Sequence, residues 1–582
     1  MVNSRTNLTD KQVECDVLVI GGGLAGCRAA IKAKEAVKGD VILAEKGVVA
    51  RVGNTISCHI ILAPAPKEAI LDWLREFVEL SEYLCDQEWV ETLLLEHPQR
   101  LKELEEWGVP LLRNDKGNLV TERCRGMMDV CKGTFFKERF WMDHVRKKLI
   151  KDGVKLLQRV MITDLFTSDG KHPTRGRVTG AAGFDIITGQ FITIKAKAVV
   201  IATGPMQPVM PYFNASTTGD GQAMAYRAGA EMISMEFSPA LGFSHIIKPP
   251  TDIGVGLARF QNHGARFINA LGERFLEKYF PDRMEQGCSF GQLSQACVRE
   301  LLDGHGPLYF DMRHWSKELY DIFKLSSPEV IDRLEKAGID IREQPIQFKL
   351  LLNYFSAQGH GGINTNLHGE SSIPGLYACG VCANAGGTEV FASVSQANCN
   401  VFGYRAGEKA GQWALQFEEA VVHPEQVETL RTATLGRLGI SDGITPNQLY
   451  HDISLKIFPY EYSLYKHENR IKDSLSHMDH IENERLPMVT AEDPHTLTKA
   501  MAVRNYLQMC RLFQLASLER KESRLGHRRE EFPYKDDIEW LKRIILKRDE
   551  GKIVSWTEPL PIEKYKLIPP KRARVWSKTR FP

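Results

Sequence analysis

Residues 17–26 read VLVIGGGLAG and residues 41–45 read VILAE, with a helix-patterned segment between them. The order is strand, glycine turn, helix, strand and acid, which is the minimal unit for holding a dinucleotide. Gly21 allows the tight turn, Gly23 lets the backbone approach a pyrophosphate, and Gly26 lets the helix pack closely on its strand. The helix N-terminus then presents unpaired N–H groups to the phosphates. We therefore predict a dinucleotide site here rather than a purely structural glycine turn.

The length and composition of the chain are those of a globular protein with several domains. Its 582 residues are too many for one hydrophobic core, so we expect about two to four domains. The net charge is only +2, so no basic surplus points to nucleic acid. Met1–Gln12 lacks the apolar core of a signal peptide, and no apolar run approaches the roughly 20 residues of a transmembrane helix.

The twelve cysteines are scattered, without the regular spacing of a secreted disulfide scaffold. We interpret them as reduced thiols of a cytoplasmic protein. Cys379 and Cys382 are either a redox dithiol or a buried strand end with two small apolar side chains, and we favour the strand end. No cluster of four cysteines offers an iron–sulfur site, and we predict no metal site.

Apolar periodicity divides the first half of the chain into helical and strand regions. Apolar residues at three- and four-residue spacing predict helices within residues 64–112. Val154–Phe166, Arg177–Asp185 and Gln190–Ile194 are predicted as strands of an antiparallel meander, because turns bearing glycine or proline separate them. The meander leads into a buried-strand pattern at residues 198–204, which ends in a glycine turn.

The second half contains a mixed region, a second strand with a glycine turn, and a charged helical region. Residues 375–380 repeat the strand and glycine turn, and the mixed region before them reads as an inserted domain. From about residue 415 the chain is mainly helical. Residues 551–582 hold eight Lys and Arg against two Glu, which is more typical of a solvated arm lying over a neighbour than of a nucleic-acid site.

Seven motifs follow one another in the order of a known flavoprotein family. They are Gly21-x-Gly23-x-x-Gly26 with Glu45-Lys46, Ala202-Thr203-Gly204, Thr218-Gly219-Asp220-Gly221, Gly272-Glu273-Arg274-Phe275, Gly361-Gly362-Ile363-Asn364-Thr365-Asn366, Gly375-Leu376-Tyr377-Ala378-Cys379-Gly380, and Arg520-Lys521-Glu522-Ser523-Arg524-Leu525-Gly526-His527. Through them, over about residues 13–545, the chain resembles the fumarate reductase and succinate dehydrogenase flavoprotein family, which includes the alpha subunit of adenylylsulfate reductase.

The resemblance implies an α/β fold with a two-part Rossmann-like FAD-binding domain, an inserted α+β capping domain and a C-terminal helical domain. We expect the first part of the FAD-binding domain at residues 1–235, the capping domain at 236–350, the second part of the FAD-binding domain at 351–414, the helical domain at 415–545 and a basic tail at 546–582.

The resemblance also implies that the dinucleotide is FAD. The second strand and turn at residues 375–380 suit a two-part FAD domain better than a classical NAD domain. Members with covalent flavin use a histidine where this chain has Asn54, so the FAD should be noncovalent. The residues expected to bind it are Gly21, Gly23, Leu24, Ala25, Gly26, Glu45, Lys46, Asn54, Thr55, Ala202, Thr203, Gly204, Asp220, Gly380, Ser395 and Gln396.

The chain departs from the family where members clamp a dicarboxylate with arginine and histidine. Fixed opposing charge and a proton donor are what a dianionic alkene needs. The family's His-Pro-Thr-Gly segment is Ser238–Leu241 here, and its shuttle-arginine segment is Cys288–Gln295, with no arginine before Arg299. The family's Asn-Arg-Leu-Gly aligns with Glu389–Ala392. The histidine that the family has four residues before Gly-Gly-Ile is Ala357 here, although His360 directly precedes the two glycines. We therefore expect a substrate other than fumarate or succinate, and one less anionic than a dicarboxylate.

Several polar residues remain that could face the flavin. They are His59, Glu236, Ser238, His245, Gln358, His360 and Glu389. His360 lies between glycines that leave it little packing, so it is either an acid or base near the flavin or a turn histidine bonded to backbone groups. We select His360, His59, Ser238 and Glu389 as candidate catalytic residues. Arg274 of the Gly-Glu-Arg-Phe motif is better explained by a structural ion pair.

Three functions fit these observations. The first is an FAD-dependent oxidoreductase that moves an electron pair between the flavin and an organic substrate, in a complex with an iron–sulfur subunit. The second is an electron-transfer subunit without a small-molecule substrate of its own. The third is a sulfur-compound reductase that resembles adenylylsulfate reductase.

Overall fold

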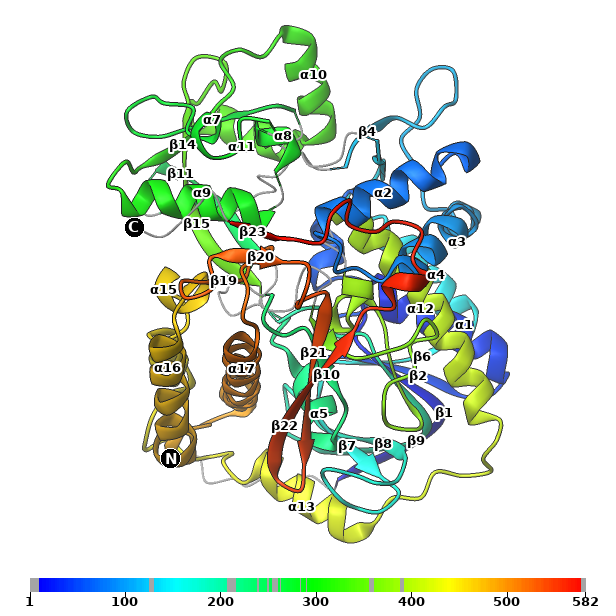
Figure 1. Cartoon of the computed structure of the whole chain (residues 1–582). Helices are drawn as coiled ribbons and strands as arrows, with labels where there is room; N and C mark the ends of the chain where they lie inside the picture. Colours follow the sequence, from blue (N-terminus) through cyan, green and yellow to red (C-terminus); the bar gives the residue numbers. More distant parts are fainter. Residues whose placement is uncertain are drawn as a thin grey trace.

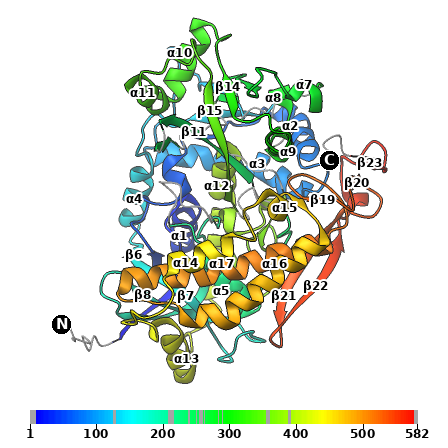
Figure 2. The same cartoon turned by 90° about the vertical axis from the view of Figure 1, so that its left-hand side faces the viewer.

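The structure is a computed structural model of the whole chain, shown in two views (Figure 1, Figure 2). It describes residues 10–124, 130–206, 216–237, 240–248, 251–253, 260–261, 263–282, 284–288, 290–354, 361–387 and 392–576.

A seven-stranded sheet forms the centre of the FAD-binding region. Its strand order is β6-β2-β1-β9-β8-β7, and β17 pairs with β9 as well. The strands are β1 (Lys11–Ile20), β2 (Val41–Glu45), β6 (Lys155–Gln158), β7 (Val160–Thr167), β8 (Val178–Asp185), β9 (Phe191–Ile201) and β17 (Leu376–Ala378). β1, β2, β6, β9 and β17 run parallel, as the strand–helix–strand pattern requires.

Strand β9 joins the two parts of this region. Its first half pairs with β8 on one side, and its last residues pair with β17 on that same side, so β17 continues where β8 ends. The patterns at residues 190–194 and 198–204 are therefore largely one strand. The predicted strand Val154–Phe166 is wrong as a single element, because Arg159 takes a positive φ of 59° and divides it into β6, parallel to β2, and β7, antiparallel to β8. The meander β7-β8-β9 is confirmed.

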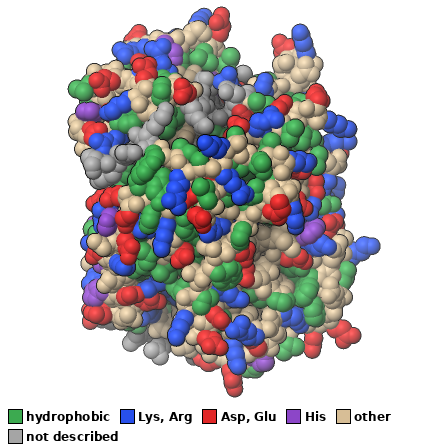
Figure 3. Space-filling model, viewed as in Figure 1, with side chains coloured by type: hydrophobic (Ala, Val, Ile, Leu, Met, Phe, Trp, Pro, Cys, Tyr) green, Lys and Arg blue, Asp and Glu red, His purple; other side chains and the backbone are tan. Residues whose placement is uncertain are grey.

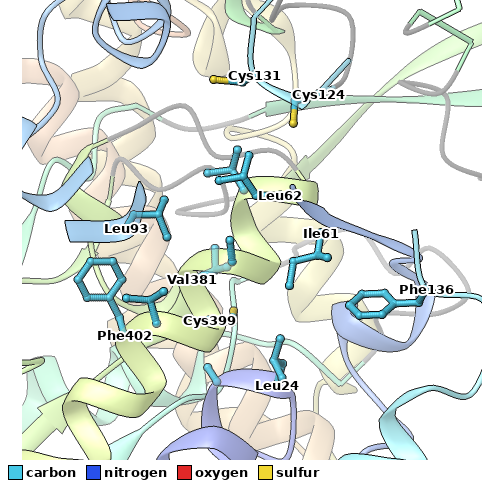
Figure 4. Packing of buried hydrophobic residues seen from close by; sticks show 14 of the residues in the cluster. Leu24, Ile61, Leu62, Leu93, Cys124, Cys131, Phe136, Val381, Cys399 and Phe402 are labelled. Carbon is cyan, nitrogen blue, oxygen red and sulfur yellow. The ribbon is translucent and has the colours of Figure 1, made fainter. Parts of the chain in front are cut away.

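Two helices from distant parts of the sequence pack against one face of the sheet. They are α1 (Leu24–Val37) and α12 (Ala392–Ala414). Gly407 permits the close approach, since a Cβ there would lie 2.2 Å from the backbone oxygen of Ala29. Figure 4 shows Leu24 of α1 and Ile61 of β3 (Ile60–Leu62) on one side of Cys399 of α12, and Phe402 of α12 on the other side, near Leu93. The predicted helical region contains α2 (Ile70–Leu80) and α3 (Gln87–Glu106), and α4 (Met142–Lys151) follows the small sheet of β3, β5 (Lys132–Phe135) and β4 (Thr121–Arg123).

The inserted region forms a five-stranded antiparallel sheet with helices around it, at the top of Figure 1. Its strand order is β12-β11-β15-β14-β13. The strands are β11 (Ala240–Lys248), β12 (Thr251–Ile253), β13 (Arg266–Ile268), β14 (Leu308–Asp311) and β15 (Ile346–Tyr354), and the helices are α7 (Leu276–Tyr279), α8 (Met284–Gly287), α9 (Phe290–Leu302), α10 (Lys317–Ser326) and α11 (Pro328–Lys336). Buried aromatic rings, including Phe260, Phe267 and Phe310, make its core. β15 contains residue 350, the expected boundary of the capping domain, and runs on to Tyr354.

The C-terminal region is helical at first and then returns to strands. The helices are α13 (Pro424–Leu435), α14 (Pro446–Ser454), α15 (Tyr460–Ser463), α16 (Glu468–His480) and α17 (Pro494–Glu519); α5 (Asp220–Ala228) of the FAD-binding region contacts α17. The hairpin of β21 (Lys542–Asp549) and β22 (Lys552–Pro559) extends a sheet with β10 (Met232–Ile233) and β16 (Gly362–Ile363). Short pairs complete the region: β18 (Tyr465–Lys466) with β19 (Arg528–Arg529), and β20 (Tyr534–Asp536) with β23 (Arg574–Trp576).

The described part of the basic tail lies against the rest of the chain. Leu567 exchanges hydrogen bonds with Gln87 of α3, and Arg574 donates to Asp536 at 2.8 Å. Basic and acidic side chains alternate over the face shown in Figure 3, in keeping with the net charge of +2.

Candidate functional site

A pocket lies at the carboxyl ends of β1, β2 and β9, where the two parts of the FAD-binding region meet. In parallel sheets this edge is where ligands bind. The pocket brings together nearly all of the residues expected to bind the dinucleotide. Those that line it are Gly21, Gly23, Leu24, Ala25, Glu45, Lys46, Asn54, Thr55, Ala202, Thr203, Gly204, Asp220, Ser395 and Gln396.

Two expected residues, Gly26 and Gly380, do not line the pocket. A Cβ on Gly26 would lie 1.8 Å from the backbone oxygen of Gly21, so this glycine lets α1 sit directly against the turn. Gly380 has a φ of 73°, and a Cβ there would lie 2.8 Å from the Cβ of Ala25. Both glycines shape the pocket from behind its wall.

The acid at the end of β2 is held by the turn that it faces. The carboxylate of Glu45 accepts hydrogen bonds from the backbone N–H of Gly22 at 2.6 Å and of Gly47 at 2.8 Å. Burial raises the pKa of Glu45, while these two donors favour its charged form. Each oxygen keeps acceptor capacity for a ligand hydroxyl.

Lys46 and Asp220 form a charged pair at the pocket wall. Lys46 Nζ donates to Asp220 Oδ2 at 2.7 Å and to Thr218 Oγ1 at 2.7 Å. Asn505 of α17 donates to the other oxygen of Asp220 at 2.8 Å. Asn505 of the helical region thus holds the carboxylate of Asp220 in place at the pocket wall.

Two buried polar atoms in the pocket wall have no partner. Among the described residues, Thr203 Oγ1 and Gln396 Oε1 make no hydrogen bond. A buried oxygen without a partner costs free energy, so such atoms are expected where a polar ligand completes them. The residues present therefore fit a dinucleotide with its phosphates, hydroxyls and polar ring edge.

Several apolar residues of the pocket carry no signal in the sequence. They are Val52, Val160, Met161, Ile162, Met224, Cys379, Val381 and Cys399. Val160–Ile162 come from β7, which the antiparallel meander places beside the pocket. No motif marks them, because only the pairing of β7 with β8 brings them there.

Three of the four candidate catalytic residues, His360, Ser238 and Glu389, lie outside the described residues, as does Gln358. His245 lies in β11, opposite Phe348 of β15. His59 is half-buried, and its backbone oxygen accepts a hydrogen bond from Phe136 N–H at 2.9 Å. His59 does not line the pocket in the described part of the chain.

Glu236 belongs to a buried charge network and not to the described pocket wall. Its Oε1 accepts from Arg520 Nε at 2.7 Å, and both side chains are fully buried. Lys466 Nζ donates to the backbone oxygen of Glu236 at 3.1 Å and pairs with His527 Nδ1 at 3.0 Å. Burial lowers the pKa of Lys466 and of His527. The Arg520–His527 motif therefore ties the helical region to the start of the capping domain.

Two other sequence interpretations can be compared with the structure. Arg274 forms the expected structural ion pair, with Nη2 2.6 Å from Glu285 Oε2. Cys379 and Cys382 are both buried thiols, and Cys382 Sγ donates to the backbone oxygen of Ile201 at 3.3 Å. Burial raises the pKa of Cys382 to about 11. The predicted strand end is displaced, because β17 ends at Ala378 and Cys382 lies in a 3-10 helix, Gly380–Cys382.

Comparison with known proteins identifies the family. The FAD binding domain family matches residues 16–395, and the fumarate reductase flavoprotein C-terminal family matches residues 456–574. A fumarate reductase flavoprotein subunit of Mycobacterium tuberculosis is 29% identical over 580 residues, covering 92% of this chain and 95% of that protein. An uncharacterized FAD-dependent oxidoreductase of Methanocaldococcus jannaschii is 28% identical over 561 residues, covering 92% and 96%.

Solved structures show the same fold. The Escherichia coli quinol fumarate reductase protein FrdA has a TM-score of 0.81 at 22% identity, covering 97% of this chain and 99% of that one. Adenylylsulfate reductase of Archaeoglobus fulgidus has a TM-score of 0.79 at 20% identity, covering 95% and 97%. Over the described residues no helix combines the length and apolar character needed to cross a membrane. The expected fold class and cofactor are confirmed: the chain belongs to the fumarate reductase and succinate dehydrogenase flavoprotein family and is an FAD-dependent oxidoreductase.

Proposed function

We propose that this oxidoreductase exchanges an electron pair between FAD and an organic substrate other than fumarate or succinate. The FAD supplies the redox chemistry, and the protein supplies position and protons. The substrate proposal rests on α9, the described segment where the family has its shuttle arginine. The first arginine of that segment, Arg299, is bound to Asp303, with Nη2 2.8 Å from Oδ1.

The rest of that segment is also engaged elsewhere. Gln295 of α9 donates to the backbone oxygen of Leu525 at 2.6 Å, and Tyr465 donates to the backbone oxygen of Gln295 at 3.0 Å. These contacts hold α9 against the helical region. Arg299, the arginine in the described part of α9, is already paired with Asp303. No other guanidinium of that helix is available for a dicarboxylate, which supports a different substrate. The relatives named fumarate reductase are less than 30% identical, so a changed substrate is compatible with them.

The residues that we propose to hold the FAD are those expected from the motifs. The N-terminus of α1, at Leu24, would receive the pyrophosphate, and Glu45 would bind ribose hydroxyls. Thr203 Oγ1 and Gln396 Oε1 would gain hydrogen-bond partners from the cofactor. Asn54 lines the pocket at the place of the family's covalent histidine, so we propose noncovalent binding. Acid precipitation should then release all flavin into the supernatant; yellow colour retained in the pellet would contradict this.

An iron–sulfur partner protein is part of this proposal. A relative from Methanothermobacter marburgensis carries the name of one component of a CoM/CoB fumarate reductase, and it is 26% identical over 559 residues. The twelve cysteines here are buried thiols, and no cysteine quartet occurs in the described chain, so electrons would have to reach the flavin from another protein or a diffusible donor. Copurification with a cysteine-rich protein that is lost on truncation at about residue 550 would support a partner held by the tail.

The decisive experiment is anaerobic reoxidation of the reduced flavin. Purified protein is reduced and mixed separately with fumarate, adenylylsulfate and a panel of enoates, and flavin absorbance is followed. Fast reoxidation by an enoate other than fumarate is the expected result, and it makes His59, His360, Ser238 and Glu389 the residues to substitute. Fast reoxidation by fumarate would overturn the substrate proposal. Response to adenylylsulfate alone would identify the sulfur reductase, and no response to any acceptor would favour the electron-transfer role.

A further inference from the structure

A second pocket lies entirely within the capping domain and has no part in the flavin pocket. Its volume is about 370 Å³, and its polar side chains are those of His263, Arg266, Arg274, Glu285 and His314. Ligand pockets in proteins typically begin at roughly 300 Å³, so a small molecule would fit. Arginine and histidine dominate this wall, in contrast to the apolar core of the same domain.

Ion pairs already occupy the carboxylates nearest to the arginines of this pocket. Glu285 accepts from Arg274 Nε at 2.9 Å and from Nη2 at 2.6 Å. Asp311 of β14 is the direct cross-strand neighbour of Arg266 in β13. The carboxylate of Asp311 is nevertheless taken by Arg313, whose Nε lies 2.8 Å from Oδ1.

Arg266 is therefore left without a counter-charge. In the part of the capping domain that the structure describes, its guanidinium makes no hydrogen bond or ion pair. Arg274 pairs with Glu285 and also lies 3.6 Å, through Nη1, from Glu277 Oε1, while Arg313 pairs with Asp311. Among the described residues, the guanidinium group left unpaired at the pocket wall is that of Arg266. An unpaired guanidinium at a pocket wall attracts anions.

The two histidines of the wall are held by different parts of the molecule. His314 Nε2 lies 3.0 Å from the backbone oxygen of Gly264, so this nitrogen carries the proton of the neutral ring. His263 Nε2 lies 3.2 Å from Glu122 Oε1 of β4, which belongs to the FAD-binding region. His314 thus borders the pocket without a carboxylate at its bonded nitrogen, whereas His263 brings the carboxylate of Glu122 with it.

We propose that this pocket binds a small oxyanion, either free or as the phosphate group of a small organic molecule, with Arg266 as its pairing group. A guanidinium presents several N–H donors in one plane, which matches two oxygens of such an anion. Arg274, already fixed by Glu285, borders the other side of the site. Sulfate represents the free anion, and 3-phosphoglycerate represents the organic phosphate.

The test is calorimetric titration of the full-length protein with its flavin bound, in low chloride, with sulfate and 3-phosphoglycerate in separate experiments. Arg266→Gln is compared with Lys336→Gln, which removes the same charge from an exposed lysine paired with Asp332 in α11. We expect one site per chain, with affinity reduced at least about tenfold by Arg266→Gln and nearly unchanged by Lys336→Gln. Arg266 is exposed, so the variant should keep its flavin content and unfolding temperature.

The two ligands distinguish the source of the anion. Tighter binding of 3-phosphoglycerate than of sulfate identifies an organic phosphate, and equal binding identifies the free oxyanion. Absence of binding of both ligands to the unaltered protein would overturn the proposal. So would an equal loss of affinity in the two variants, because that is a general charge effect and not a site.

Discussion

The flavin pocket and the capping-domain pocket are built in different ways. The first is shaped by backbone: a glycine turn, a helix N-terminus and strand ends, with its one prominent charged pair, Lys46 and Asp220, already closed. The second is shaped by side chains, and one of its cations, Arg266, has no described partner. The flavin pocket depends on how closely backbone segments approach one another, whereas the capping-domain pocket depends on the charges of its side chains. Substitutions should therefore act through sterics in one and through electrostatics in the other.

The largest effect is expected where the backbone approach is closest. Gly26→Ala places a methyl group 1.8 Å from the backbone oxygen of Gly21, so α1 must move away from the turn. We expect a loss of about 3 kcal/mol or more in the free energy of unfolding and loss of bound FAD. Denaturant unfolding and the ratio of flavin to protein absorbance after desalting measure the two effects. Unfolding unchanged from the original protein would contradict the steric basis of this pocket.

Gly23→Ala should weaken FAD binding without destabilising the fold. The new methyl group meets only Thr55 Oγ1 at 3.4 Å, an ordinary contact, but Gly23 lines the pocket where the pyrophosphate is expected. We expect FAD affinity to fall at least about tenfold while the unfolding temperature of the flavin-free protein changes by about 2 °C or less. Flavin retained at full occupancy would show that the phosphates do not approach Gly23.

The same difference explains what the sequence could predict. Glycine positions, strand ends and Glu45 follow from local pattern, and all but two of the residues expected at the flavin line one pocket. Val160–Ile162 were missed because strand pairing alone brings β7 there. The predicted break between residues 194 and 198 failed because Lys195 and Lys197 interrupt the apolar run, yet β9 continues through both with buried residues around them.

The capping-domain pocket could not be predicted from local pattern. Arg266 and Asp311 lie 45 positions apart in the sequence and meet only through the pairing of β13 with β14. Which arginine keeps the carboxylate depends on side-chain geometry, since Arg313 reaches Asp311 from the same turn. Arg274 was correctly assigned to an ion pair, but its partner Glu285 carried no signal in the sequence.

Two substitutions that change the charge around Asp311 should change the affinity for the anion in opposite directions. Arg313→Gln frees the carboxylate to pair with Arg266, its cross-strand neighbour, so we expect about threefold to tenfold weaker sulfate binding. Asp311→Asn removes the negative charge, and we expect binding about threefold tighter. Calorimetric titration with sulfate measures both. Changes of the same sign in the two variants would mean that Arg266 and Asp311 do not compete for the anion.

The smallest effect concerns pH. Burial lowers the pKa of His314, and the neighbouring Arg266 and Arg274 lower it further, while Asp311 and the Gly264 carbonyl oppose them. A bound anion favours the charged ring and so raises this pKa, which means that binding takes up a proton. Affinity for sulfate, which does not titrate in this range, should thus rise about threefold as pH falls from about 7.5 to 5.5.

His314→Gln should remove this pH dependence, whereas His263→Gln should preserve it. The distinction matters because His263 also lines the pocket, but its Nε2 faces Glu122 of the neighbouring region at 3.2 Å. If His263→Gln flattens the profile instead, the titrating contact is the one between the capping domain and β4. The pH dependence of anion binding would then arise from the His263–Glu122 contact between the two regions and not from the ring of His314.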